Sequence, residues 1–169
     1  MSKKFGFILP NNLFRDKEYF EPKNILENAG IQVITISKEL KQCHGKLGAK
    51  VIPELTLKNI NISNFAGIAF IGGSGSKEYW HDPSAHQIAH QAFILDKVLA
   101  AICSAVATLA FTGLLTNKHA NSFQSERTIL EKYGAILSND ECVVDGKIIT
   151  ANGLKASKKF GEKILKLLT

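Results

Sequence analysis

Short, continuously apolar segments alternate with helix-like segments along the chain, and this alternation limits the fold more than any other feature. The apolar segments are rich in β-branched and aromatic residues, which favours strands. We predict strands over residues 5–9, 31–37, 67–71 and 98–102. Strands that are apolar on both faces are typical of a parallel sheet covered by helices on each side. The sequence therefore predicts an α/β fold.

The segments between these strands carry the start and stop signals of helices. Pro83 stands where the first turn of a helix accepts proline, and Gly30 stands where a helix ends. We expect Asp16 to cap the first helix. The predicted helices cover residues 16–29, 84–97, 104–112, 126–133 and 154–168, and residues 142–150 form a predicted hairpin that turns at Asp145-Gly146. Residues 38–64 carry weaker signals and predict a small excursion from the sheet.

Length and composition fit one ordinary globular domain. The chain has 169 residues, of which 45% are hydrophobic and 21% are charged, and a chain of this kind can bury a full core. We therefore predict a single domain over residues 1–169. The short apolar run near the N-terminus stops at Pro10, so we interpret it as the first strand rather than a signal peptide. No stretch approaches the roughly 18 apolar residues of a membrane span, and we expect no membrane partner.

The net charge of +6 raises the question of nucleic-acid binding. The densest group of lysines, in residues 155–166, alternates with apolar residues at helical spacing. We interpret it as the solvent-facing side of a helix and expect no nucleic-acid partner, since no recognition motif is present. The three cysteines are far apart and form no CxxC pair. This spacing argues against a disulfide framework or a zinc site and indicates a reducing, cytoplasmic environment.

Cys103 stands at the junction between a predicted strand and a predicted helix. The free N–H groups of a helix N-terminus carry partial positive charge and favour a thiolate over a thiol. The sequence therefore predicts an activated sulfur nucleophile.

The loop Gly72-Gly73-Ser74-Gly75 also follows a predicted strand, so it is expected at the same edge of the sheet as Cys103. It lacks the ending of a phosphate-binding P-loop. We favour a loop whose amides approach a reacting oxygen, with a plain tight turn as the alternative.

These features, in this order, resemble the ThiJ/PfpI superfamily, also called the DJ-one superfamily. The resemblance rests on the Gly-Gly loop, the run Ala100-Ala-Ile-Cys103, the segment Gly113-Leu-Leu-Thr-Asn-Lys and the hairpin, and it covers nearly the whole chain. It implies a flavodoxin-like sandwich with a mostly parallel central sheet, helices on both faces and a small β-hairpin near the C-terminus. It also implies a homodimer.

The resemblance assigns roles to individual residues. Glu18 stands four residues before Pro22, as does the superfamily glutamate that contacts the reactive sulfur. We expect its carboxyl to be protonated beside a thiolate, to donate a hydrogen bond to the sulfur and to lower the pKa of Cys103. The backbone N–H groups of Gly73 and Ser104 would form an oxyanion hole.

The chain departs from the superfamily at three informative positions. Ser104 replaces the histidine that follows the cysteine in protease-like members, which argues against proteolysis because a peptidase needs a base to shuttle protons. Phe123 replaces a histidine of the parkinsonism-associated branch, and Asn152 replaces its anion-binding arginine. We expect both to line a pocket less polar than in either branch. Trp80 and His81 follow the glycine loop and are further candidates for that lining, although we favour a surface turn.

The other chemically active side chains have simpler interpretations. His86 and His90 are four residues apart on a predicted helix, but no third ligand is evident, and we expect no metal or other cofactor. Cys43 lies in the weakly patterned region, where we interpret it as a dispensable thiol. Cys142 is expected to pack in a strand.

The resemblance implies chemistry on small reactive aldehydes such as methylglyoxal, as in glyoxalases or deglycases. Cys103 would add to the carbonyl carbon, and Glu18 would serve as general acid and base. Two alternatives stay open. The protein could be a non-catalytic oxidative-stress sensor or protective protein whose Cys103 is oxidised by an oxidant to a sulfinate, or an intracellular peptidase or amidase, which Ser104 disfavours.

Overall fold

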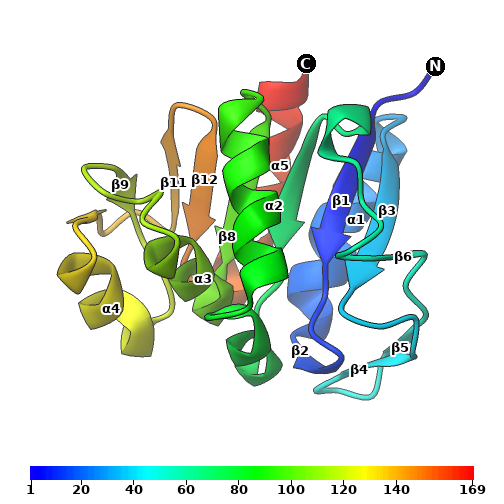
Figure 1. Ribbon diagram of the computed structural model, residues 1–169, viewed down its shortest axis with the longest axis horizontal. Helices are drawn as coiled ribbons and strands as arrows, with labels where there is room; N and C mark the ends of the chain where they lie inside the picture. The colour runs from blue at the N-terminus through cyan, green and yellow to red at the C-terminus, as the bar shows by residue number, and fades with distance from the viewer.

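The computed structural model describes residues 1–169 and contains a seven-stranded central sheet (Figure 1). Its strands are β1 (Lys4–Ile8), β3 (Gln32–Ser37), β6 (Leu55–Thr56), β7 (Gly67–Phe70), β8 (Val98–Ile102), β11 (Cys142–Asp145) and β12 (Ile148–Ala151). They lie in the order β11-β12-β8-β7-β1-β3-β6. Every neighbouring pair is parallel except the hairpin β11–β12. The predicted mostly parallel α/β sheet and its C-terminal hairpin are confirmed.

Helices cover both faces of this sheet (Figure 1). They are α1 (Asp16–Asn28), α2 (Pro83–Ile94), α3 (Val106–Phe111), α4 (Arg127–Lys132) and α5 (Ser157–Leu168). Helices α1 and α5 pack on one apolar cluster, whereas α2, α3 and α4 pack on the other. Strand β1 contributes side chains to both clusters. Phe5 and Phe7 pack on the α1 side, and Ile8 packs on the α2 side. No helix is both long and apolar enough to span a membrane.

Shorter elements surround the main sheet. Strands β2 (Asn12–Phe14), β4 (Cys43–Gly45) and β5 (Lys50–Val51) form a three-stranded sheet, and β9 (His119–Ala120) pairs with β10 (Ile136–Leu137). The 3₁₀ helices are η1 (Ile62–Asn64), η2 (Ser74–Tyr79), η3 (Cys103–Ala105), η4 (Gln124–Glu126) and η5 (Leu154–Ala156). The predicted excursion over residues 38–64 therefore contains β4 and β5, and it returns to the main sheet through β6.

Asp16 does not cap α1, contrary to the prediction. The N-cap position is Arg15, whose side chain makes no capping hydrogen bond. The Asp16 carboxylate instead accepts hydrogen bonds from the backbone N–H groups of Leu47 at 3.0 Å and Ala49 at 3.1 Å. This carboxylate therefore fastens the turn between β4 and β5 to the start of α1.

The carboxyl ends of β1, β7 and β8 meet at one edge of the sheet, because these three strands are adjacent and parallel. Strand β1 leads into α1, β7 leads toward Gly72, and β8 leads directly into Cys103. After β1 the chain adds β3 on one side of that strand, and it later adds β7 on the other side. Ligands of α/β sheets usually bind where the order of the strands reverses in this way. A site is therefore expected at this edge.

Candidate active site

Cys103 occupies a strained turn between β8 and α3. Its φ is +61°, a left-handed backbone conformation that is uncommon for a residue with a side chain. The strand ends at Ile102 and η3 begins at Cys103, so the chain turns from strand to helix at the sulfur-bearing residue, as in a nucleophile elbow. The residue is 6% exposed, which leaves the thiol buried but at the edge of the sheet.

Glu18 lies in the first turn of α1, and its side chain is fully buried. Neither of its carboxyl oxygens has a hydrogen-bond partner within the protein. Gly72, which has no side chain, lies between this carboxyl and Cys103. A β-carbon added to Gly72 would overlap Oε2 of Glu18 and lie 2.6 Å from Cβ of Cys103. The two side chains therefore converge across a residue that has none.

Burial controls the proton affinities of this pair. Loss of solvent raises the pKa of Glu18 to about 7, although the Cys103 thiol, the Arg15 charge and the Gly72 backbone each pull it down. Burial also raises the pKa of Cys103 to about 12, followed in size by repulsion from the Glu18 carboxylate. The backbone N–H of Ser104 opposes this rise by stabilising the thiolate.

The predicted lowering of the Cys103 pKa is therefore wrong. The helix after the cysteine is short, a three-residue η3 followed by a six-residue α3, so its partial charge is outweighed by burial. Because Glu18 and Cys103 share one site, they titrate as a pair. The raised pKa of Glu18 leaves its carboxyl able to hold or release a proton near neutral pH, while burial favours the thiol form of Cys103.

Glu18 and Cys103 line a cavity of about 650 Å³. The rest of its lining comes from Arg15 and from residues within the segments 121–127, 139–141 and 152–155. Only 3 of its 14 lining residues are hydrophobic. Charged and amide side chains dominate the lining, and they arrive from segments that no sequence pattern connected with the site. The lower polarity expected relative to the two branches of the superfamily stays a prediction.

Phe123 and Asn152 both line this cavity. The backbone N–H of Phe123 donates a hydrogen bond to the carbonyl oxygen of Cys103 at 3.4 Å, which holds the 121–127 segment against the elbow. On the other side, Gly153 has a φ of +147°, and a β-carbon there would lie 4.0 Å from Sγ of Cys103. The Phe123 ring also lies near this point, because the same β-carbon would be 3.8 Å from Cδ2 of Phe123.

Trp80 and His81 do not line the cavity; they lie in a turn after η2 with His81 exposed, which agrees with the surface-turn interpretation. The indole Nε1 of Trp80 donates a hydrogen bond to the carbonyl oxygen of Ser104 at 3.0 Å. The His81 ring packs on Phe111, with 4.2 Å between ring centroids. Both residues support the elbow from the α3 side instead of facing a ligand.

The two expected oxyanion donors differ in their positions. Ser104 directly follows Cys103, and its backbone N–H acts on the sulfur. Gly73 has a φ of +112° and packs so closely on the backbone of residues 13–15 that a β-carbon would overlap the Leu13 carbonyl oxygen. Gly73 does not line the cavity, and its role as an oxyanion donor stays a prediction.

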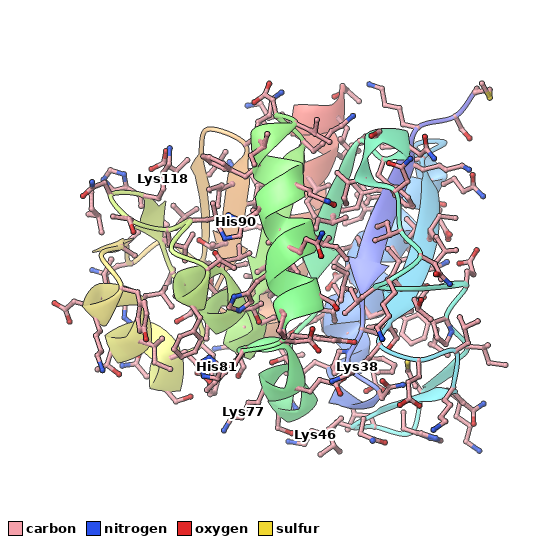
Figure 2. All side chains as sticks on the ribbon, viewed as in Figure 1. Lys38, Lys46, Lys77, His81, His90 and Lys118 are labelled. Carbon is pink, nitrogen blue, oxygen red and sulfur yellow. The ribbon has the colours of Figure 1, made fainter.

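The remaining histidines and lysines do not gather into a second centre. Figure 2 shows His81 beside α3 and His90 on α2, with the four labelled lysines spread over separate parts of the molecule. His86 on α2 forms a 2.6 Å hydrogen bond between Nε2 and the carbonyl oxygen of Trp80. No group of three His, Cys, Asp or Glu side chains is arranged to hold a metal ion.

The cationic part of the cavity lining was not predicted from the sequence. Arg15 and Arg127 line it together with Lys155. The Arg127 guanidinium donates hydrogen bonds to Asn121 and to oxygens of residues 138–139, which ties the 121–127 segment in place. Single basic residues in loops produce no periodic pattern. The one available signal was the position of Arg15, one helical turn before the expected glutamate.

Comparison with known proteins agrees with this geometry. The sequence matches the DJ-1/PfpI family over residues 3–167. An uncharacterized protein of Methanocaldococcus jannaschii is 35% identical over 99% of this chain and 82% of its own length. The protein named deglycase PfpI from Pyrococcus furiosus is 28% identical over 85% of this chain and 87% of its own. The chain therefore belongs to the DJ-1/PfpI family.

Solved structures support the same assignment. A ThiJ/PfpI domain protein from Brachyspira murdochii superposes with a TM-score of 0.96 at 27% identity, over 99% of this chain and 96% of that one. DJ-1beta of Drosophila melanogaster has a TM-score of 0.90 at 24% identity, over 99% and 91% of the two chains, and shows the shared fold. The flavodoxin-like sandwich expected from the resemblance is confirmed.

Proposed function

We propose that this protein acts through Cys103 on small reactive aldehydes, with glyoxalase-like or deglycase-like chemistry. The observation that supports it is the convergence of Glu18 and Cys103 across Gly72, beside a cavity of about 650 Å³. A carboxyl group with a pKa of about 7 can both accept and return a proton at neutral pH, which is what a general acid and base requires.

The first step is addition of the Cys103 thiol to the aldehyde carbon. Glu18 takes the thiol proton as the S–C bond forms, and the π electrons of the carbonyl move to its oxygen. That oxygen then takes a proton, which completes a hemithioacetal. We assign the N–H groups of Gly73 and Ser104 to the developing negative charge on this oxygen.

A 2-oxoaldehyde substrate can then complete an internal redox reaction. Glu18 removes the proton from the former aldehyde carbon and returns it to the neighbouring carbonyl carbon, while the hydroxyl proton of the hemithioacetal passes to the oxygen of that second carbon. The first carbon becomes a thioester and the second an alcohol, so one is oxidised as the other is reduced. Water hydrolyses the thioester and releases a 2-hydroxy acid and the free thiol.

The names of two relatives support this proposal over its alternatives. Deglycases from Pyrococcus furiosus and Pyrococcus horikoshii are 28% and 27% identical to the chain. A peroxide sensor needs a thiolate at rest, whereas burial raises the pKa of Cys103 to about 12. A peptidase needs a proton shuttle beside the thiol, and no histidine lines the cavity.

Formation of lactate from methylglyoxal tests the proposal. We expect Cys103→Ser and Glu18→Gln each to lower kcat/KM by roughly 100-fold or more, the usual contribution of a nucleophile or a general base. Cys142→Ser is the matched control, because Cys142 lies outside the cavity lining, and it should keep the wild-type rate. Equal lactate formation by wild type and Cys103→Ser would contradict the proposal. Selective oxidation of Cys103 by peroxide without aldehyde turnover would favour the sensor.

We further propose that the chain is a single domain that works as a homodimer in the cytoplasm. The resemblance implies the dimer. The exposed apolar side chains Leu47 and Ile52 beside the small sheet provide a test of its interface. All three cysteines are free thiols, which fits a reducing compartment.

A further inference from the structure

Arg15 is a half-buried cation at the candidate site that has no ionic partner. It lines the cavity with Glu18 and Cys103, and no hydrogen bond or salt bridge in the structure uses its guanidinium. Its backbone is fixed, because its N–H donates to the carbonyl oxygen of Gly72 at 3.0 Å and its own carbonyl oxygen accepts from the Tyr19 N–H at 3.2 Å. The side chain is thus anchored next to the reacting pair.

The other charges of the cavity do not neutralise Arg15. Glu141 is bound by Lys159 at 2.8 Å, so its charge is already compensated. Arg127 is held by neutral oxygens, and Lys155 forms no salt bridge. Three cations therefore face the cavity, against Glu18 alone as an uncompensated acid.

Glu18 cannot serve as a permanent partner for these cations. Its carboxyl is buried without a hydrogen-bond partner, and the proposed reaction requires it to pick up a proton during each turnover. Whenever Glu18 is protonated, the cavity lining carries excess positive charge. Such a site attracts an anion from solution, and a guanidinium fork matches the two oxygens of a carboxylate.

We propose that the substrate of the Cys103 site is an aldehyde that also carries a carboxylate, which Arg15 binds while Cys103 adds to the carbonyl carbon. This inference rests on the function proposed above and narrows its substrate class. Lys155 and the amide side chain of Asn152 also line this cavity and can supply further donors.

A matched pair of substrates tests the inference. The probe 4,5-dioxopentanoate is a 2-oxoaldehyde with a carboxylate, and 2-oxopentanal is its neutral counterpart. We expect wild-type kcat/KM to be at least 10-fold higher for the charged probe. Arg15→Gln should reduce this ratio at least 10-fold, and Arg15→Lys should restore part of it. Lys17→Gln removes one positive charge from the exposed face of α1 and should leave the ratio unchanged. A ratio near one, or a ratio insensitive to Arg15→Gln, would overturn the inference.

A binding measurement separates this inference from the proposed function. Glutarate should protect Cys103 of the wild-type protein from alkylation by iodoacetamide, read by peptide mass spectrometry, and should protect Arg15→Gln at least 10-fold less well. Turnover of neutral aldehydes without glutarate protection would overturn the carboxylate site alone. Arg15-dependent protection without turnover of any aldehyde would support the anion site while the proposed function fails. Stronger protection by inorganic phosphate than by glutarate would assign Arg15 to phosphorylated ligands and overturn the carboxylate.

Discussion

Cys103 and Glu18 show how burial outweighs partial charge at the scale of single residues. The Ser104 N–H favours the thiolate, as expected at the start of a helix, but solvent loss and the nearby carboxylate raise the pKa of Cys103 to about 12. Burial thus favours the thiol form of the sulfur. In the proposed mechanism Glu18 takes its proton, so reactivity would depend on the pair rather than on the cysteine alone.

Glu18 should make the stability of the protein depend on pH. Its pKa is raised from 4.5 to about 7, so between these values the unfolded chain releases a proton that the folded protein retains. The free energy of unfolding therefore falls as pH rises through this window and levels off above it. The free energy of unfolding of Glu18→Gln, taken relative to that of wild type, should therefore rise by up to about 3 kcal/mol between pH 4 and pH 8. Urea unfolding at both pH values measures this difference, and a difference independent of pH would contradict it.

The same substitution should make Cys103 easier to ionise. The Glu18 carboxylate repels the thiolate, so Glu18→Gln should lower the pKa of Cys103, measured from the pH dependence of its alkylation by iodoacetamide. Glu141→Gln is the matched control, because Glu141 lines the cavity but is paired with Lys159. A higher thiol pKa in Glu18→Gln would instead show that Glu18 stabilises the thiolate as a hydrogen-bond donor.

Local sequence patterns predicted Cys103, and the family resemblance implied Glu18, but neither predicted the full site. Cys103 ends a recognisable apolar strand, and Glu18 stands four residues before Pro22, as the superfamily glutamate does. Arg15 and Arg127 reach the cavity only because the loops after different strands meet at one edge of the sheet. That meeting depends on tertiary packing, and no pattern of neighbouring residues encodes it.

At the scale of elements, close packing of α1 against α5 sets the position of Glu18. A β-carbon on Gly161 of α5 would lie 2.8 Å from Cα of Pro22 in α1, so the two helices touch where α5 has no side chain. Pro22 lies one turn after Glu18 and lacks the N–H that would bond to the Glu18 carbonyl oxygen. Displacement of α1 at this contact would therefore move the Glu18 carboxyl.

Gly161→Leu tests this coupling between the helices and the site. Leucine favours a helix more than glycine does, but its side chain has no space against α1, and overpacking of this kind costs about 2 kcal/mol. We expect lower stability in urea unfolding and a further loss of kcat/KM in the protein that remains folded. Lys163→Leu places the same residue at an exposed position of α5 and should change neither quantity strongly. Full activity of Gly161→Leu would contradict the coupling.

The long elements of the fold were predictable, whereas the short ones were not. Strand β8 and the hairpin β11–β12 have strong β-branched or apolar patterns, and their predicted positions agree with the structure. Strands β2, β9 and β10 contain only two or three residues each. Such short strands exist because a partner strand supplies hydrogen bonds, so their own residue preferences carry little information.

At the scale of the whole molecule, the small sheet β2-β4-β5 leaves apolar side chains in solvent. Leu47 is 81% exposed and Ile52 is 68% exposed, and both lie beside the hairpin of β4 and β5, while Leu13 of the paired strand β2 is also exposed. Exposed apolar side chains of this size can contribute to an interface between chains. The sheet packs beside the start of α1 through Asp16, so contact with a second copy would also bear on the element that carries Glu18.

We therefore expect the protein to sediment as a dimer whose interface includes the small sheet. The double substitution Leu47→Glu with Ile52→Glu should shift it to a monomer, because burying two unpaired carboxylates is costly. Ile94→Glu is the matched control, since Ile94 is equally exposed but lies at the end of α2 that is remote from β4 and β5 (Figure 1). Sedimentation equilibrium gives the mass, and circular dichroism shows that each variant stays folded. A monomeric wild type, or dissociation caused equally by Ile94→Glu, would contradict this interface.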